Sequence, residues 1–319
     1  MKNENMSQEH GVLKRYRGGP DPVLPKEIHT IGKKAFFHAK IDSCTCSAPA
    51  LTIGNSAFAQ STLRRGQLLG ARCVIGDNAF ENCEKLESLA FSGEALEIGA
   101  GTFRGCAALE DIAFLEKAQT VGNYAFDSCT AVTCAVLGPD LAALPEGLFA
   151  NCESLQSVAF QREYAHFPDW LLSGCRALTQ IPWTAGIQSV GYAAFQNCWS
   201  VTETVFPDTL RQAGEQCFSG CRNLRQVKWG KGCNAIPAGA FMFCEALEEI
   251  EIPEGVETIG QYAFWNCGKL TYLRLPDSLR EVGRRAFSGC GGCTVEIGPD
   301  TCRGDWEKDV KNVVCRRAR

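Results

Sequence analysis

Apolar and polar positions along this chain follow a unit of about 23 residues that recurs over almost the whole length. Each unit contains a block such as residues 259–267, IGQYAFWNC, in which an aliphatic residue and usually glycine precede phenylalanine and then cysteine. The phenylalanine slot falls at twelve positions, which are Phe36, Phe58, Phe80, Phe103, Phe126, Phe149, Leu172, Phe195, Phe218, Phe241, Phe264 and Phe287. Successive numbers differ by 22 in the first two steps and by 23 in the next nine. A fixed period of this length predicts a solenoid of stacked repeats.

Each repeat predicts two short extended segments joined by turns. In residues 270–275, LTYLRL, inward apolar positions alternate with outward polar ones, as in a strand with one buried face. A turn often built on proline follows, as at Pro276, and a second extended piece over residues 279–282 leads to the glycine, which is expected to turn the chain. The Ala-Phe pair of the block predicts a short helical turn. Residues 290–297 repeat the strand pattern with one residue missing. We therefore expect an α/β repeat solenoid, rich in β, with about twelve coils.

The N-terminal end departs from the repeat. Residues 1–23 are polar and contain several glycine and proline breakers, so we expect a flexible tail there. The solenoid is expected over residues 24–298. Its first part, residues 24–79, is degenerate, since Ala39 and Ser61 stand where later repeats have cysteine. An exposed solenoid end must cover its core, so these coils are predicted to be capping repeats.

The C-terminal end is also irregular. We expect a cap and a basic tail over residues 299–319, with Arg316, Arg317 and Arg319 in solvent.

Residues 305–314 predict a short helix within this cap. That helix would place Trp306, Val310 and Val313 over the last coil.

Two columns of large apolar residues predict the core. The first is the phenylalanine column, expected to be structural at Phe80, Phe103, Phe126, Phe149, Phe195, Phe218, Phe241, Phe264 and Phe287. The second occupies the last inward slot of each strand, at Phe91, Phe114, Leu137, Phe160, Trp183, Phe206, Trp229, Ile252 and Leu275. An aromatic series of this kind also suits a platform for carbohydrates or bases, but its phase in the repeat assigns it to the core.

Ten of the nineteen cysteines share one slot of the repeat. They are Cys83, Cys106, Cys129, Cys152, Cys175, Cys198, Cys221, Cys244, Cys267 and Cys290. Adjacent coils lie about 4.8 Å apart, so these thiols should form a column inside the stack. Side chains that leave in parallel suit disulfide geometry poorly. We expect a reduced, structural cysteine ladder in preference to disulfides or a metal site.

The overall composition excludes several classes of protein. The chain has an apolar fraction of 45%, a charged fraction of 21%, a net charge of −4 and a pI near 5.7. These values indicate a folded protein without the basic surface that nucleic acids or anionic membranes require. No apolar run is long enough to insert in a membrane. Residues 1–25 contain no apolar segment typical of an export signal. We expect a cytoplasmic protein, or a cell-surface or secreted one if the native N-terminus is longer.

The repeat resembles a known family. The pattern L-x-x-L-x-L within a period of about 23 residues is the signature of leucine-rich repeats. Together with the IG-x-x-AF-x-x-C block, it resembles the BspA-like leucine-rich repeats of bacterial surface proteins over residues 24–298. The resemblance implies a right-handed superhelix with a parallel sheet on its concave side. It also implies binding of proteins or host-surface ligands.

Outward strand positions are free of packing constraints, so function is expected there. In early repeats they are small and neutral, as at Ser88, Ala90, Ser157 and Ala159. In late repeats they are long and polar, and the candidate partner-binding residues are Glu203, Gln226, Lys228, Glu249, Glu251, Tyr272 and Arg274. Such a face can make directional contacts with a protein. The alternative interpretation is that these residues only solvate the open face of the sheet.

Signals for catalysis are weak. The histidines are His10, His29, His38 and His166, and none pairs with a nearby histidine or cysteine at the spacing of metal ligands. No glycine-rich phosphate loop is present. Cys290 and Cys293 form a CxxC segment, CGGC, near Cys302, but a tetrahedral site needs four ligands.

The leading hypothesis is a non-enzymatic module, without cofactor and monomeric, that binds a protein or peptide on its concave sheet. The second hypothesis is a surface or secreted adhesin for host matrix or glycans. The third is a thiol or zinc protein that uses the CGGC segment.

Overall fold

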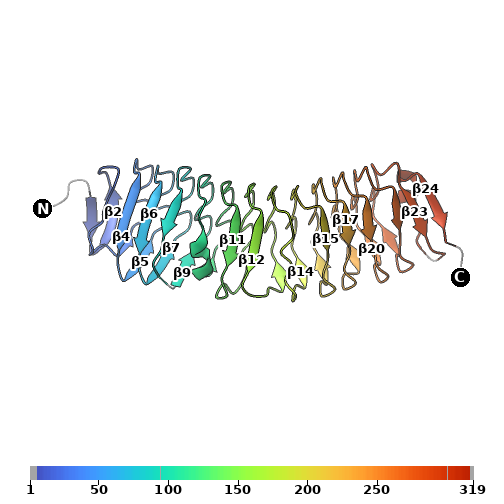
Figure 1. The fold of residues 1–319 in the computed structure, drawn as a ribbon, viewed down its shortest axis with the longest axis horizontal. Coiled ribbons are helices and arrows are strands. Elements are labelled where there is room, and N and C mark those ends of the chain that lie inside the picture. Colours follow the sequence, from blue (N-terminus) through green and yellow to red (C-terminus); the bar gives the residue numbers. More distant parts are fainter. Residues whose placement is uncertain (1–5, 94, 300, 317–319) are drawn as a thin grey trace. The chain divides into compact units, whose positions relative to one another are not determined.

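The computed structural model describes residues 6–93, 95–299 and 301–316. The fold is a β-solenoid of about twelve coils, built from short stacked strands and almost no helix (Figure 1). Two units can be distinguished, Met1–Arg162 and Glu163–Arg319. In both, most coils contribute one strand to each of two rows of parallel strands, which confirms the class of fold expected from the period.

The N-terminal unit holds three groups of paired strands. One sheet contains β1 (Met6–Glu9), β2 (Val12–Tyr16), β3 (Thr30–Ile31), β5 (Ala50–Ile53), β7 (Arg72–Ile75), β9 (Ala95–Ile98) and β10 (Ala118–Val121). The other groups are β4 (Ser43–Ser47), β6 (Arg65–Leu69) and β8 (Ser88–Ala90), and then β11 (Cys134–Leu137) with β12 (Ser157–Phe160). A 3₁₀ helix, η1 (Ala113–Lys117), lies between β9 and β10 in the chain.

The C-terminal unit repeats the same two rows. One row contains β13 (His166–Phe167), β14 (Ser189–Val190), β16 (Gln212–Ala213), β18 (Ala235–Ile236), β20 (Thr258–Ile259) and β22 (Glu281–Val282). The other contains β15 (Glu203–Val205), β17 (Gln226–Lys228), β19 (Glu249–Glu251), β21 (Tyr272–Arg274), β23 (Thr294–Ile297) and β24 (Asn312–Cys315). A second 3₁₀ helix, η2 (Asp305–Asp309), precedes β24.

Strand register follows the repeat length. Gln226 lies opposite Glu249 in the parallel pair β17–β19, at the full spacing of the regular repeat. Tyr272 lies opposite Thr294 in the pair β21–β23, at a spacing one residue shorter. The one-residue deletion expected in residues 290–297 is therefore confirmed, and the pairing stays in register because the missing residue lies outside the strand.

The helical turn expected at the Ala-Phe pair is wrong. The block around Phe264 contains two left-handed residues, Tyr262 (φ 57°) and Asn266 (φ 60°), which a right-handed helix does not admit. The Phe264 N–H donates to the carbonyl of Ala286 in the next coil at 2.8 Å, and the Cys267 N–H donates to the Phe264 carbonyl at 3.2 Å. Turns within a coil thus alternate with hydrogen bonds between coils.

The glycine of the block begins a turn and also allows close packing between coils, since its carbonyl accepts from the Ala263 N–H at 3.3 Å. A Cβ at Gly260 would lie 2.4 Å from the backbone nitrogen of Ala238 in the preceding coil. Gly260 is absent from the residues with positive φ. Absence of a side chain, and not left-handed geometry, is therefore what this slot requires.

Phenylalanine rings stack along the centre of each unit. Phe264 is fully buried, and its ring centroid lies 5.5 Å from that of Phe241 and 5.6 Å from that of Phe287. The inward residue of the neighbouring strand row packs against this column, as Trp229 does on Phe241 at 5.8 Å. The two columns pack against each other, although Phe91, Phe160, Trp183 and Ile252 of the second column are only half-buried.

The N-terminal segment differs from expectation. Residues 6–16 form an antiparallel hairpin, β1–β2, and β2 pairs in parallel with β3. Leu13 is fully buried, and the Tyr16 ring lies 4.9 Å from that of Phe36. The hairpin therefore packs on the first coil, and the flexible tail is wrong for this stretch. Residues 1–5 lie outside the described residues.

The degenerate coils fold as regular ones. Strands β4 and β6 pair over five residues each, and Cys44 and Cys46 fill inward slots with about 1% exposure or less. Cysteines occupy these inward slots in place of the usual aliphatic residues. The strand pattern was therefore not recognised in the sequence. The capping role of these coils stays a prediction.

The C-terminal segment is only partly helical. The helix η2 ends at Asp309, and β24 then pairs in parallel with β23, so one helix over residues 305–314 is wrong. Trp306 is buried against Phe287, with ring centroids 5.6 Å apart, whereas Val310 and Val313 stay half-exposed. The β-branched run favours a strand over a helix.

Arg316 is not a solvated tail residue, since it bonds to the Asp277 carboxylate. Residues 317–319, with the other two arginines of the expected basic tail, lie outside the described residues. Within the described ranges no helix has the length and apolar character needed to cross a membrane.

Candidate interaction surface

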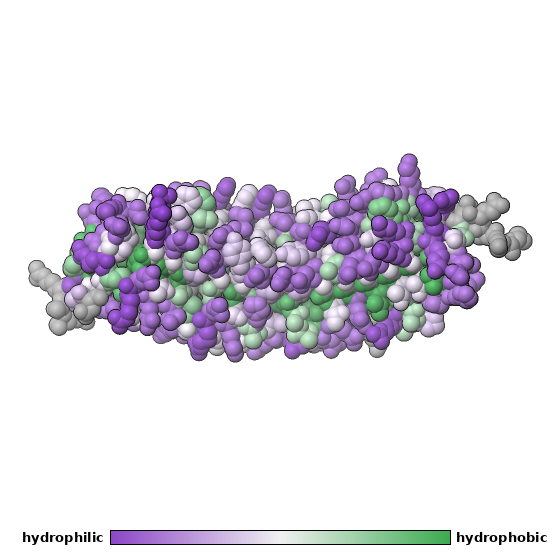
Figure 2. Space-filling model, turned by 180° about the vertical axis from the view of Figure 1, so that it is seen from behind, coloured by the Kyte–Doolittle hydropathy of each residue, from purple (hydrophilic) through white to green (hydrophobic). Residues whose placement is uncertain are grey.

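The outward side chains of the strand row β15 to β24 form two columns. Parallel register places Glu203, Gln226 and Glu249 in the first column. Tyr272, Thr294 and Asn312 continue it. The second column contains Val205, Lys228, Glu251, Arg274, Glu296 and Val314. We call these twelve residues the strand face. Hydrophilic residues cover much of the face of the molecule that Figure 2 shows.

The seven candidate binding residues all lie on the strand face, and all are exposed. Their strands expose alternate residues because the intervening ones, such as Val227 and Ile250, are buried in the core. Five of the seven line one shallow depression of about 160 Å³ together with Val205, namely Glu203, Gln226, Lys228, Glu249 and Glu251. Tyr272 and Arg274 lie on the neighbouring strand β21, beside β19.

The charged groups of β17 and β19 on this face are only loosely tied to one another. The Lys228 ammonium lies 3.3 Å from a carboxylate oxygen of Glu251, and both side chains are more than half exposed. Exposed pairs of this kind contribute less than about 1 kcal/mol to stability. Both charges therefore stay available to a partner.

A hydrogen-bonded network fixes the end of the face near β24. The Tyr272 hydroxyl donates to the Glu296 carboxylate, and this bond raises the pKa of Tyr272. The Arg316 guanidinium lies 3.9 Å from Glu296 and also bonds to Asp277. Tyr272 is 50% exposed, so it presents its ring to solvent while the network holds its hydroxyl.

Sequence reasoning missed Glu296 and Val314 as members of this face. Glu296 lies after the one-residue deletion before β23, so the regular spacing of 23 residues does not lead to it. Val314 was missed because a helix, and not the strand β24, was expected over residues 305–314. The alternation Thr-Val-Glu-Ile in residues 294–297 was the signal that would have placed Glu296 outward.

The cysteine column forms hydrogen bonds between coils. The Cys267 thiol donates to the Phe241 carbonyl at 3.2 Å, and Cys244 donates in the same way to Phe218 at 3.2 Å. The same bond recurs, at 3.0–3.3 Å, for Cys83, Cys106, Cys129, Cys152, Cys198, Cys221 and Cys290. None of these nine thiols is part of a disulfide bond. The column therefore acts as a set of buried S–H donors.

The CGGC segment offers no accessible thiolate. Cys290 and Cys293 are fully buried, and Cys290 donates to the Phe264 carbonyl at 3.2 Å. Burial raises the pKa of Cys293 to about 12. The neighbouring Cys267 side chain lowers the pKa of Cys290, but no solvent reaches this sulfur. Among the residues described, no three His, Cys, Asp or Glu side chains are grouped so as to hold a metal ion.

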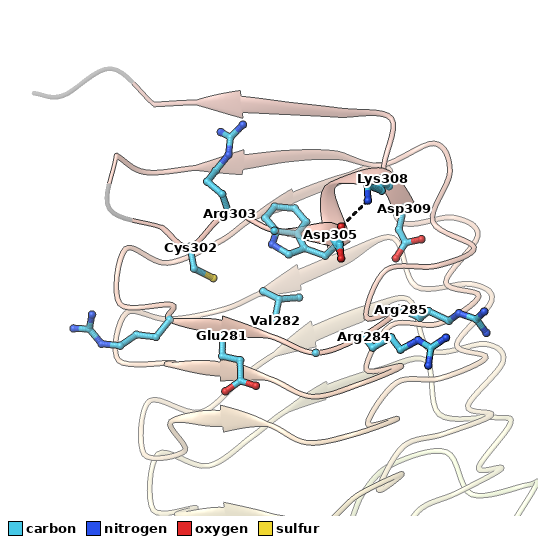
Figure 3. A pocket seen from close by; sticks show the side chains of 13 residues that line it. Glu281, Val282, Arg284, Arg285, Cys302, Arg303, Asp305, Lys308 and Asp309 are labelled. Atoms are coloured by element: carbon cyan, nitrogen blue, oxygen red, sulfur yellow. Dashed lines mark hydrogen bonds and ion pairs between the residues drawn. The ribbon is translucent and has the colours of Figure 1, made fainter.

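A cavity of about 660 Å³ lies between β22 and η2 (Figure 3). Its acidic and basic groups do not converge. Lys308 is paired with Asp305 at 2.6 Å, and Arg284 and Arg285 extend to the side opposite Cys302 (Figure 3). These side chains therefore do not point at one common position where they could bind a substrate or an ion together.

These features define a leucine-rich-repeat solenoid. Its inward positions repeat the same apolar residue types, whereas its outward strand positions differ in charge and size from coil to coil. The sequence matches the BspA type leucine-rich repeat region in six copies, over residues 21–70, 73–198 and 166–294. The chain therefore belongs to the BspA-type leucine-rich-repeat family.

Solved bacterial structures share this fold. A leucine-rich-repeat protein from Bacteroides ovatus ATCC 8483 is 22% identical with a TM-score of 0.55, covering 98% of this chain and 97% of the other. A leucine-rich cell surface protein from Faecalibacterium prausnitzii A2-165 is 18% identical with a TM-score of 0.53, covering 100% and 93%. The comparison with curated proteins found no match.

Proposed function

We propose that this protein is a non-enzymatic interaction module that binds a protein or peptide on the strand face. One observation carries the proposal. Seven large polar or aromatic side chains stand exposed on adjacent strands whose other residues hold the core. The core does not need these side chains, and Tyr and Arg among them are residues that interfaces favour.

Membership of the family supports the absence of catalysis, since leucine-rich repeats typically mediate interactions between proteins. The geometry of the strand face agrees with this. Its depression is shallow and opens beside charged side chains, which suits an extended ligand better than a small buried substrate.

Replacing Glu249, Tyr272 and Arg274 together by alanine is expected to weaken ligand binding at least about tenfold, as expected when central interface residues are lost. Peptides are first selected from a displayed random library on the wild-type protein, and their affinities for both proteins are then measured by titration. The melting temperature should change little, because all three side chains are exposed.

The matched control is Glu245→Ala with Lys269→Ala, which removes two exposed charges on the turns of the same two coils. This control should bind the selected peptides as the wild type does. The proposal fails if those peptides bind the triple variant within about twofold of the wild type.

A cell-surface adhesin for host matrix or glycans is a second candidate. It is favoured by the F. prausnitzii protein of the same fold, which is named a cell surface protein. Our first choice is a cytoplasmic location, because the thiols that bond to carbonyls must stay reduced, and disulfides form in oxidising compartments.

The two locations are distinguished by protease treatment of intact producing cells. A cytoplasmic protein should stay intact until the cells are lysed, while total protein and a known surface marker serve as controls. Digestion in unbroken cells would select the adhesin instead.

A further inference from the structure

Positive and negative side chains alternate along the second column of the strand face. From β15 to β24 it reads Val205, Lys228, Glu251, Arg274, Glu296 and Val314. The four central charges therefore alternate as plus, minus, plus, minus, with an exposed valine at each end. Read backwards, the column has the same valines and the opposite sign at every charged position.

Such an order is complementary to itself under a two-fold rotation. The axis of this rotation is parallel to the strands and passes between β19 and β21, which lie side by side. Rotation about it reverses the order of the coils in a second copy that faces the first. Lys228 then faces Glu296 of the partner subunit, and Glu251 faces the partner's Arg274. Paired strands are spaced about 4.8 Å apart within each group of three, and β19 lies beside β21, so the rotation brings the six positions of one copy opposite those of the other.

We infer that the strand face binds a second copy of this chain in antiparallel orientation. The inference rests on the proposed function and names the partner of that same face. At high protein concentration we therefore expect a dimer in place of the monomer expected from the sequence.

The exposed fractions of the two valines and of Lys228 and Glu251 support this pairing, whereas the Glu296 side chain is 27% exposed and already accepts from Tyr272. Val205 is 60% exposed and Val314 is 49% exposed, and in the dimer each packs on the other across the interface. The side chains of Lys228 and Glu251 are 53% and 62% exposed, so they can turn towards a partner. No large apolar patch is required.

The first column adds no repulsion. The rotation places Glu249 opposite Tyr272 of the partner subunit and Gln226 opposite the partner's Thr294. Glu203 faces Asn312 of the partner subunit. Each acidic group of this column therefore meets a neutral side chain, and no two like charges oppose one another in either column.

The contact area decides the strength of the dimer. Six strands and two outward positions on each cover a few hundred Å² per copy, on the order of half or less of the roughly 800 Å² typical of stable complexes. We therefore expect a transient dimer whose selectivity comes from charge and whose affinity falls as salt rises.

Charge reversal at the centre of the interface tests the inference. Glu251→Arg places two pairs of arginines against each other in a homodimer, and Arg274→Glu places two pairs of glutamates. Each variant alone should associate at least about tenfold more weakly than the wild type in sedimentation experiments at about 20 mM salt.

Mixing the two variants gives the decisive result. The first variant has arginine at both central positions and the second has glutamate at both, so every arginine faces a glutamate in the mixed dimer and association should return. The double variant Glu251→Arg/Arg274→Glu should also associate with itself. Glu257→Arg, an exposed reversal in the same coil outside the strand face, should leave association unchanged.

Circular dichroism melting checks that each variant is folded. If one of them is not, Lys228→Glu and Glu296→Lys provide a second complementary pair. The inference is overturned if the wild type stays monomeric at about 100 µM, or if the mixture associates no more than its components. Peptide binding lost in the alanine triple variant would then still support the proposed function, so the two failures are distinguishable.

Discussion

Raising the pH from 9 to 10 is expected to lower the free energy of unfolding by roughly 5–10 kcal/mol. The cause is the buried cysteine column. Desolvation raises the pKa above the ordinary value of 9.0 for Cys83, Cys106, Cys129, Cys152, Cys198, Cys221, Cys244 and Cys267. In the unfolded chain these thiols lose their protons above about pH 9, whereas in the fold they keep them.

The folded state thus binds more protons than the unfolded state above pH 9, so stability falls as pH rises. Each thiol contributes up to about 1.4 kcal/mol per pH unit until its folded pKa is reached, which is about 11 for Cys83 and about 12 for Cys221. Because native proteins are stable by only about 5–15 kcal/mol, we expect the solenoid to unfold near pH 10.

Urea unfolding followed by circular dichroism between pH 7 and 10, with a reductant present, measures this slope. Cys244→Ser keeps a hydroxyl donor but does not titrate in this range, so the slope should fall by about one thiol. Cys134→Ser changes an exposed thiol and should leave the slope unaltered. A stability that is flat between pH 9 and 10 would contradict the buried, protonated column.

Truncation of Phe264 to alanine is expected to destabilise the protein by about 3–5 kcal/mol at neutral pH. The ring is fully buried and stacks on Phe241 and Phe287, with interplanar angles of 15° and 9°. Its removal leaves a cavity between two coils. Hydrogen bonds between backbones hold these coils in place, so the neighbouring rings cannot close the gap.

Urea denaturation at neutral pH with a reductant measures this loss. Tyr272→Ala is the control, since it truncates a half-exposed aromatic on the adjacent strand and should cost about 1 kcal/mol or less. A loss below about 1 kcal/mol for Phe264→Ala would show that the ring column is not the principal core of this unit.

The candidate site was predictable from the sequence where the repeat is regular. Gln226, Lys228, Glu249 and Glu251 follow their buried neighbours with period two, and the structure has them outward on paired strands. The outward position of Glu296 was not predicted, because a one-residue deletion precedes it and breaks the regular spacing. No pattern in the sequence predicted that Arg316 would return to bond with Asp277.

By itself the sequence determined the period, the solenoid and the inward phenylalanine and cysteine slots, because stacking identical coils leaves one way to bury a repeated apolar pattern. Only the tertiary structure decided how the turns are made. The left-handed Tyr262 and Asn266 arise because hydrogen bonds to the next coil replace those of a helix. It also decided the order of charges across the strand face, since that order depends on which strands lie side by side.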